Sequence, residues 1–410
     1  MASHLRSVEE HLQHILEVVG PLAPYEQPLL ETLGLPLCEN VSAPIALPSF
    51  DNSSMDGYAV RSDDVVGAAD DGPVRLPVVG ESAAGQTKAY ALAGGTALRI
   101  MTGAPLPSGA DAVVPLEWTN EGVAEVQIYR APGPGQHVRH AGEDVQVGDP
   151  LLDEGASIGP RAVGLLAAVG RSQVRSRPRP RVVVVSTGSE LREPGTDLGF
   201  DSIYDSNSFM LAAAVRATGA IAYRVGIVPD DPTRFANALS DQLVRADVVI
   251  TSGGVSKGDY DVVKEVLGKV GTVDFCEVAM QPGKPQGFGT VGEDSTPIFA
   301  LPGNPVSSYV SFEVFVVPAL RRMMGKVPYR RPVVRAPCAH GFRSIEGKRQ
   351  FVRGLFTVEA GGAQVSVVGG HGSHLLGDLA HSNGLIVVPE DVTVVDPGSS
   401  VEVMVLDRDF

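Results

Sequence analysis

Two stretches in the middle of the chain place hydroxyl, glycine and acidic residues directly after short apolar runs. Residues 182–185 run into Ser186-Thr187-Gly188-Ser189-Glu190, and residues 248–250 run into Thr251-Ser252-Gly253-Gly254. Each pattern predicts a buried strand followed by a tight loop. Such loops direct free backbone N–H groups at anions, and carboxylate oxygens are the ligands that Mg²⁺ takes together with phosphates. These residue types therefore suit chemistry on a phosphate-bearing substrate.

Two further apolar runs end in a similar way. Residues 298–301 precede Pro302-Gly303-Asn304-Pro305, and residues 223–228 precede Pro229-Asp230-Asp231-Pro232. The carboxyl ends of parallel strands meet at one edge of a sheet, where ligands bind. We therefore interpret residues 178–326 as a doubly wound α/β/α domain with a parallel-rich sheet and its site at that edge. One such loop is more often only a turn or a helix cap, but four together favour a site.

Other motifs in this domain are less informative. Gln281-Pro282-Gly283-Lys284-Pro285 predicts a fixed turn that presents Lys284 to the same edge. Asp205-Ser206-Asn207 is interpreted as the N-cap of a helix that ends at Ala217. Residues 287–292 fit the dinucleotide pattern G-x-G-x-x-G, but these glycines flank a strand and run into an acidic turn, so we reject that interpretation. The phosphate-binding pattern G-x-x-x-x-G-K-[ST] is absent from the sequence.

Composition excludes several classes of function. The 410 residues include 48 acidic and 33 basic side chains, a net charge of −15, which opposes general binding to nucleic acid or to an anionic membrane. Cys38, Cys276 and Cys338 are widely spaced, so neither a disulfide framework nor a zinc site is supported, and the reducing cytoplasm fits best. We find no signal peptide and no run of the ~18 apolar residues that a membrane span requires.

The rest of the chain predicts three further domains around the α/β domain. Residues 46–141 alternate short strands with Gly and Pro turns and are expected to form a β-rich second domain. Residues 1–45 together with 142–177 are assigned to a small linking α+β domain. Residues 327–410 return to strands and are expected to form a C-terminal β-barrel or sandwich. The expected strands outside the α/β domain are 76–79, 97–101, 112–115, 123–129, 333–336, 350–358, 364–368, 385–388 and 400–406.

Taken together, these motifs resemble the MoeA family, which includes the E domain of gephyrin. The resemblance covers nearly the whole chain, in order and without large gaps. It is carried by the run 50–61 (Phe-Asp-Asn-Ser-Ser-Met-Asp-Gly-Tyr-Ala-Val-Arg), Met101-Thr102-Gly103-Ala104-Pro105, Gly142-Glu143-Asp144, Ser186-Thr187-Gly188-Ser189-Glu190-Leu191, Ser252-Gly253-Gly254-Val255-Ser256, Pro282-Gly283-Lys284-Pro285 and Leu301-Pro302-Gly303-Asn304-Pro305-Val306-Ser307.

The resemblance implies a molybdopterin molybdenumtransferase. In that reaction molybdate and adenylylated molybdopterin (molybdopterin-AMP) react with the assistance of Mg²⁺ to give molybdenum cofactor and AMP. Family members look like elongated homodimers of four domains, with the active cleft between the α/β domain of one subunit and the β-rich domain of the other. Carried over by position, the family's functional acids and hydroxyl are Asp56, Thr102, Asp144, Glu190, Asp230 and Asp261. Pro302 and Pro305 match its proline-rich loop, and Arg353 and Ser373 match positions of its C-terminal domain.

The residue types support this assignment independently. Glu190, Asp230 and Asp261 are expected at strand ends of one sheet edge, where their carboxylates would bind Mg²⁺. Hydroxyls and glycines of the adjoining loops, with a helix N-terminus behind the glycine loop, suit a phosphate. The candidate substrate-binding residues are Ser186, Thr187, Ser189, Gly253, Gly254, Ser256, Lys284, Pro302, Gly303, Asn304, Pro305, Arg353 and Ser373.

Two positions depart from the family pattern. Gln281 stands where the family often carries lysine, and Glu277 stands where some members have a basic residue. One or two charges that could attract molybdate are therefore missing, and Lys257 is a candidate replacement. These departures concern the anion pocket rather than the reaction.

Two other functions are open at this point. One is the preceding adenylylation of molybdopterin, which belongs to a related α/β domain that usually stands alone. The other is a gephyrin-like scaffold, which uses an additional domain and linker that we do not find. The β-rich domains favour metal insertion, with transient contacts to the adenylylating enzyme and to recipient apo-molybdoenzymes. The choice between molybdate and tungstate stays open.

Overall fold

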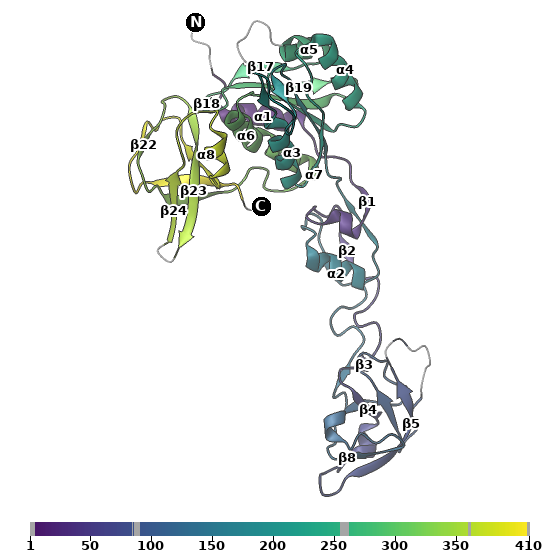
Figure 1. Cartoon of the computed structure of the whole chain (residues 1–410). Coiled ribbons are helices and arrows are strands. Elements are labelled where there is room, and N and C mark those ends of the chain that lie inside the picture. The colour runs from purple at the N-terminus through teal and green to yellow at the C-terminus, as the bar shows by residue number, and fades with distance from the viewer. Residues whose placement is uncertain (1–4, 84, 86–90, 255–261, 360–361, 408–410) are drawn as a thin grey trace. The chain divides into compact units, whose positions relative to one another are not determined.

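The computed structural model describes residues 5–83, 85, 91–254, 262–359 and 362–407 (Figure 1). The chain divides into two compact units. One contains Met1–Tyr25, Gly34–Pro36 and Ser176–Phe410, and the other contains Glu26–Leu33 and Leu37–Arg175. None of the helices in the described ranges has the length and apolar character that crossing a lipid bilayer requires.

The first unit is built around a six-stranded sheet of order β15-β12-β16-β20-β19-β17. Its first four strands run parallel, and β19 and β17 are antiparallel to their neighbours. The parallel strands are the four apolar runs that end in polar loops, so those loops meet at one edge as predicted. The strands are β12 (Arg181–Ser186), β15 (Ile221–Arg224), β16 (Val248–Ser252), β17 (Asp274–Glu277), β19 (Pro285–Val291) and β20 (Thr296–Leu301).

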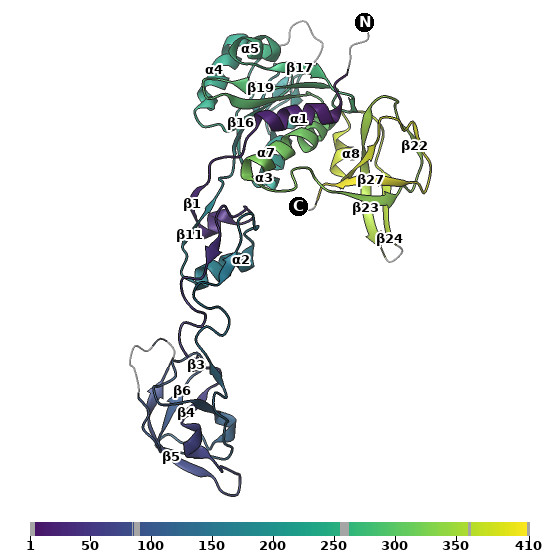
Figure 2. The same ribbon diagram turned by 180° about the vertical axis from the view of Figure 1, so that it is seen from behind.

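Helices cover both faces of this sheet (Figure 2). Alternate residues of β12 divide between two cores: Val182 and Val184 join one, and Val183 and Val185 join the other. This two-residue period is what a strand buried on both sides requires. The helices on the first face are α1 (Val8–Val18), α3 (Asn207–Ala217), α6 (Pro305–Ser311) and α7 (Val317–Met324), with a π-helical turn at Phe312–Val316; those on the second are α4 (Pro232–Leu243) and α5 (Val262–Val270).

The first helix differs from its expected place. Residues 1–45 were assigned to the linking domain, but Leu12 and Ile15 of α1 are buried in the core of the α/β domain. The helix begins with a capping box, in which Ser7 and Glu10 exchange side-chain and backbone hydrogen bonds. Its apolar residues lie on one face at helical spacing, and the nearest large apolar surface is the one that α7 and the sheet provide.

The C-terminal part of the first unit forms a mostly antiparallel sheet of order β18-β23-β25-β27-β21, with β24 also paired to β23. All five predicted C-terminal strands are present. One strand, β18, comes from the α/β segment and pairs in parallel with β23. The elements are β18 (Met280–Gln281), β21 (Val333–Pro337), β22 (Phe342–Arg343), β23 (Arg349–Glu359), β24 (Gly362–Val367), α8 (Leu376–Ala380), β25 (Gly384–Val388), β26 (Val394–Val395) and β27 (Ser400–Val405).

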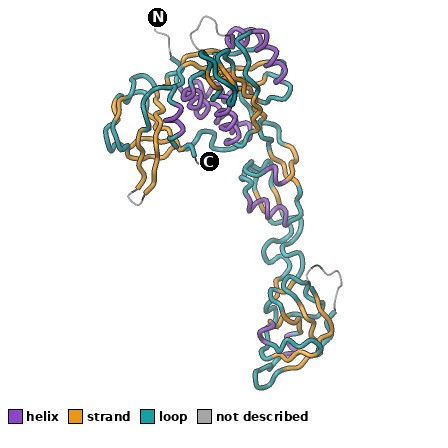
Figure 3. Tube along the Cα trace, in the orientation of Figure 1, coloured by secondary structure: helices purple, strands orange, loops and turns teal. Residues whose placement is uncertain are grey.

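The second unit contains a five-stranded sheet of order β7-β4-β6-β5-β8, drawn as orange strands in Figure 3. Four strands were predicted. The second strand in this order, β4 (Gly57–Val60), was not, because only three apolar residues follow the polar run, and all four of its residues are buried. The others are β5 (Val74–Ser82), β6 (Ala97–Ile100), β7 (Ala112–Pro115) and β8 (Glu125–Ile128).

The remaining elements of this unit are short. The helix α2 (Pro160–Ala168) follows Gly159 and has Pro160 at its first position. Three two-stranded pairs belong to the described part of this unit, together with 3₁₀ turns at Leu29–Thr32, Ser62–Val65 and Leu116–Trp118. The pairs are β1 (Tyr25–Pro28) with β11 (Gln173–Ser176), β2 (Val41–Ser42) with β10 (Pro150–Leu152), and β3 (Asn52–Ser53) with β9 (Val138–Arg139).

Candidate active site

A cavity of about 390 Å³ lies at the carboxyl edge of the parallel strands. The loops after β12, β16 and β20 form it, together with Asp230, which follows β15. The structure therefore brings Thr187 together with residues that lie 43 to 120 positions further along the sequence. The lining residues are Thr187, Gly188, Glu190, Asp230, Gly253, Gly254, Pro285, Pro302, Gly303, Asn304 and Ser307.

Two carboxylates, those of Glu190 and Asp230, line this acid-lined cavity. The Ser189 N–H donates to Asp230 Oδ2 at 3.0 Å, and the Asp230 N–H is 3.3 Å from Ser189 Oγ, so the two loops are tied together. Both acidic residues are exposed, and water can therefore solvate their charged forms. Among the described residues there is no group of three or more His, Cys, Asp or Glu side chains placed to hold a metal ion. Two carboxylates nevertheless fit Mg²⁺, which usually takes one or two of them with water and substrate phosphates.

The glycine loop and the proline-rich loop form adjoining parts of the cavity wall. The Gly253 N–H donates to the Leu301 carbonyl at 3.1 Å. Gly253 and Gly254 have φ of 99° and 74°, a region that L side chains rarely adopt. A Cβ on Gly303 would lie 3.6 Å from the Gly253 Cα, so the two backbones nearly touch. Ser256, Lys257 and Asp261, which were predicted to belong to this site, lie outside the described residues.

The start of α3 supplies a feature that the sequence interpretation missed. Asp205 is buried and accepts hydrogen bonds from Ser186 Oγ at 3.0 Å and from the Ser208 N–H at 3.0 Å. Ser186, predicted to bind substrate, therefore points into this network and does not line the cavity. The Asn207 side chain donates to Ser252 Oγ and to the Gly303 carbonyl. The sequence signal was present, since two polar residues flank Ser206, but an N-cap explained it equally well.

The proline-rich loop also contacts the C-terminal domain within the same unit. Asn304 Nδ2 donates to Ser373 Oγ at 3.0 Å, and the Val306 N–H donates to the Ser373 carbonyl at 3.1 Å. Pro305 is the first residue of α6. Ser373 is thus held against the proline-rich loop, although it does not itself line the acid-lined cavity.

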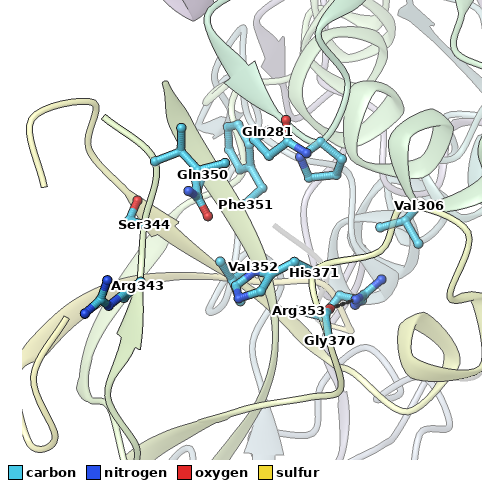
Figure 4. A pocket seen from close by; sticks show the side chains of 12 residues that line it. Gln281, Val306, Arg343, Ser344, Gln350, Phe351, Val352, Arg353, Gly370 and His371 are labelled. Atoms are coloured by element: carbon cyan, nitrogen blue, oxygen red, sulfur yellow. Dashed lines mark hydrogen bonds between the residues drawn. The ribbon is translucent and has the colours of Figure 1, made fainter. Parts of the chain in front are cut away.

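A second cavity of about 330 Å³ lies between the turn at Gln281 and the C-terminal sheet (Figure 4). Two arginines line it, Arg343 and Arg353, and Figure 4 shows them on different sides of the space. The buried amide nitrogen of Gln350 has no hydrogen-bond partner in the described structure. The full lining is Gln281, Pro282, Val306, Arg343, Ser344, Ile345, Gln350, Phe351, Val352, Arg353, Gly370 and His371.

Arg353 is 4% exposed and is held mainly by backbone carbonyl groups. Its guanidinium donates to the Gly372 carbonyl at 3.0 Å and to the Gly370 carbonyl, and it lies 3.9 Å from Asp378. Burial lowers the pKa of Arg353, although the nearby Asp378 raises it. In this arrangement the arginine fixes the loop that carries Ser373 and contributes positive charge to the second cavity.

Lys284 differs from its expected orientation. Its ammonium group pairs with Glu277 Oε2 at 2.9 Å, and neither side chain lines either cavity. The pair arises because β17 and β19 are antiparallel, with Glu277 opposite Pro285. The neighbouring residues do reach the cavities: Pro285 lines the acid-lined cavity and Gln281 lines the second one. Of the two departures noted in the sequence, Gln281 therefore begins this turn and Glu277 ends the strand before it.

In the second unit the structure brings together Asp56 and Thr102. Asp56 Oδ1 accepts hydrogen bonds from the Thr102 N–H at 2.6 Å and from Thr102 Oγ1 at 2.7 Å. These bonds hold the pKa of Asp56 below its usual range. Asp144 is exposed in the turn after Gly142, and its N–H donates to the Leu47 carbonyl. No hydrogen bond within the described residues joins the Asp144 carboxylate to Asp56 or Thr102.

Comparison with known proteins decides the family. Three family profiles match in order: the MoeA N-terminal region (domain I and II) at residues 6–170, a probable molybdopterin binding domain at 183–322, and the MoeA C-terminal region (domain IV) at 335–406. Molybdopterin molybdenumtransferase 2 of Mycobacterium tuberculosis is 47% identical over 405 residues, covering 97% of this chain and 99% of that protein. The chain belongs to the MoeA family.

Other MoeA-family proteins agree with the assignment. Molybdopterin molybdenumtransferase of Haemophilus influenzae is 37% identical over 369 residues, covering 89% of each chain. A crystal structure of the molybdopterin biosynthesis MoeA protein of Pyrococcus horikoshii superimposes with a TM-score of 0.79 at 32% identity, covering 99% of this chain and 100% of that one. The MoeA resemblance drawn from the sequence motifs is thereby confirmed, as is the coarse order of N-terminal, α/β and C-terminal regions.

Proposed function

We propose that the chain is a molybdopterin molybdenumtransferase of molybdenum cofactor biosynthesis. It inserts molybdate into adenylylated molybdopterin with Mg²⁺ and releases AMP. The observation that carries this proposal is the acid-lined cavity, where Glu190 and Asp230 stand beside the glycine and proline-rich loops. The names of relatives that are 37–47% identical over most of the chain support it.

The residues of this cavity suit a phosphoanhydride. Glu190 and Asp230, with Asp261 as a further candidate, would hold Mg²⁺, which neutralises phosphate charge and favours departure of AMP when bound. The backbone of Gly253 and Gly254 lets an anionic group approach closely because no Cβ intervenes. Thr187, which is buried beside them, offers a hydroxyl at the same edge.

The second cavity suits the oxyanion. Arg343 and Arg353 supply positive charge, and Gln350 and Gln281 supply amide groups that can donate hydrogen bonds. A dianion such as molybdate is stabilised there, whereas two carboxylates would repel it in the acid-lined cavity. The turn at residues 281–285 contributes to both cavities, so it is the natural border between the two substrates.

The functional assembly that we propose is a homodimer in the cytoplasm. Asp56 and Thr102 would then act on the substrate held by Glu190 and Asp230 of the partner copy. The test mixes two inactive variants, Asp56→Ala and Asp230→Ala. Each mixed dimer regains one of its two clefts, so mixed dimers alone have about half of wild-type activity. A random mixture, in which about half of the dimers are mixed, has about a quarter. A fully active monomer, or no recovery from mixing stable dimeric variants, contradicts the shared cleft.

The central experiment measures AMP release from adenylylated molybdopterin with and without molybdate. We expect release that depends on both molybdate and Mg²⁺. Adenylylation is the competing function, and it predicts pyrophosphate release from ATP and molybdopterin instead. A scaffold predicts neither product. We further propose transient contacts with the adenylylating enzyme, which supplies the substrate, and with recipient apo-molybdoenzymes.

A further inference from the structure

One side-chain amide joins two loops of the acid-lined cavity. Asn207, the first residue of α3, donates from Nδ2 to Ser252 Oγ at 2.8 Å and to the Gly303 carbonyl at 2.6 Å. Ser252 ends β16 and leads into the glycine loop, and Gly303 follows β20 in the proline-rich loop. The amide therefore bridges the ends of two neighbouring parallel strands.

The orientation of this amide is defined by its partners. The Gly303 carbonyl can only accept a hydrogen bond, so it requires the NH₂ side of Asn207. The opposite atom, Asn207 Oδ1, is buried and has no partner in the described structure. Turning the amide would place oxygen against the Gly303 carbonyl and lose that bond. The bridge thus needs an amide, and a carboxylate of the same shape cannot replace it.

The bridge also orients the peptide group after Gly303. In a trans peptide the N–H points opposite to the carbonyl, so drawing the Gly303 carbonyl toward Asn207 directs the Asn304 N–H away from it. Asn304 lines the cavity, and its N–H has no acceptor within the described ranges. This N–H is placed to donate to an anionic group of a bound substrate.

We propose that Asn207 is a positioning residue of the active site. It sets the separation of the glycine and proline-rich loops and aims the Asn304 N–H, and it does so through Ser252 and Gly303 rather than by touching substrate. Asp205, two residues earlier, ties the end of β12 to the same helix start. The N-terminus of α3 thereby holds three consecutive strand ends. This inference rests on the proposed transferase function.

The decisive variant is Asn207→Asp. Aspartate keeps the size of the side chain and is favourable in the first turn of a helix, so a purely helix-forming role predicts unchanged or higher thermal stability and unchanged kinetics. The positioning role predicts loss of the bond to Gly303. We expect kcat/KM for adenylylated molybdopterin to fall about 10- to 100-fold, the size of effect that a misplaced binding group produces. We expect KM for molybdate to change less than about twofold, because the second cavity is intact.

Asn237→Asp is the matched control. Asn237 is exposed on α4 of the same domain. The substitution therefore adds the same charge as Asn207→Asp without touching the loops, and we expect wild-type kinetics. Asn207→Ala removes the bridge without adding charge. It should also lower kcat/KM, and Ser252→Ala should add little to it, since the Asn207–Ser252 hydrogen bond is already lost in Asn207→Ala.

A readout independent of turnover is hydrogen exchange at residues 252–254 and 301–304. We expect faster exchange there in Asn207→Asp and Asn207→Ala, and no change in Asn237→Asp. Exchange and kcat/KM that both stay within about twofold of wild type overturn the inference, as does faster exchange with unchanged kinetics. Wild-type protein that releases no AMP contradicts the proposed function instead, and this result is separate because it needs no variant.

Discussion

A single residue, Thr102, donates both of the hydrogen bonds that Asp56 Oδ1 accepts. The backbone N–H lies 2.6 Å from that oxygen and the side-chain hydroxyl lies 2.7 Å from it. Asp56 precedes β4 and Thr102 follows β6, and these strands are paired, so the sheet fixes the contact. Both bonds stabilise the charged carboxylate, which is why its pKa lies below the ordinary value of 3.8. The other carboxylate oxygen accepts no hydrogen bond within the described residues.

Thr102→Val removes the hydroxyl donor and keeps the N–H donor. We expect the pKa of Asp56 to rise toward its ordinary value, because one of two bonds to the charged form is lost. AMP release should fall about 10-fold, which corresponds to ~1.4 kcal/mol for a hydrogen bond to a charged group. A carboxylate titration by NMR checks the pKa. Thr96→Val, at a hydroxyl that donates to the Ala93 carbonyl, is the control, and an unmoved Asp56 titration in Thr102→Val contradicts the prediction.

Asp230→Asn and Glu190→Gln test the metal assignment. Each keeps the shape of the side chain but removes a charge, so we expect weaker Mg²⁺ dependence and loss of most AMP release, by roughly 100-fold or more. Magnesium titrations of the rate, with calorimetry of AMP and Mg²⁺ binding, provide the measurement.

The neighbouring residue gives a close control for this test. Asp231 caps α4 by accepting from the Arg234 N–H at 2.8 Å, and asparagine caps about as well as aspartate. Asp231→Asn should therefore keep both stability and turnover. Equal losses at positions 230 and 231 would show that the effect is a general loss of negative charge.

Glu277→Gln should strengthen the binding of molybdate. The substitution removes the carboxylate that pairs with Lys284 at 2.9 Å and frees that ammonium group beside the second cavity. Because both side chains are about one-quarter to one-third exposed, screening limits the gain, and we expect KM for molybdate to fall about 2- to 5-fold. Steady-state kinetics at low and high salt measure it. Glu265→Gln, which frees Lys269 on α5, should leave KM unchanged.

His11 should make the first unit sensitive to mild acid. The ring is 1% exposed, packs edge-on against Phe315, and lies within 3.6 Å of Arg6 and Cys276 atoms. Burial first, and the charge of Arg6 second, lower its pKa to about 3. Between pH 6.5 and 3 the unfolded chain therefore binds a proton that the folded chain does not, and stability falls as the pH falls.

The size of this effect can be measured against a variant that does not titrate. From pH 7 to pH 4, wild type should lose about 3 kcal/mol more unfolding free energy than His11→Gln. Urea unfolding at both pH values provides the comparison. His340→Gln removes an exposed ring and should lose as much as wild type. A parallel pH dependence in wild type and His11→Gln would show that His11 protonates equally in both states.

The sequence predicted the sheet edge well, because Val182 to Val185 and the similar runs are apolar on both faces and end in loops rich in Gly, Ser, Pro and acidic residues. The sequence did not predict contacts that depend on how two strands pair or on a backbone carbonyl group far along the chain. Nothing local indicates that Glu277 meets Lys284, since the pairing of β17 with β19 decides it. The same holds for Asn207, whose partners lie 45 and 96 residues away. Tyr58 was missed for another reason, because its strand begins inside a polar run.

The short strand β18 has a consequence for dividing this protein. Met280 and Gln281 belong to the α/β segment, yet they pair with Arg349 and Gln350 in the C-terminal sheet. A fragment ending at residue 326 would leave that strand with an open edge, and a fragment starting at 327 would lack the strand that covers β23. Exposed edges of this kind invite aggregation. The two regions must therefore be expressed, swapped between homologues or redesigned as one piece, with the 281–285 turn taken from the same parent as its C-terminal sheet.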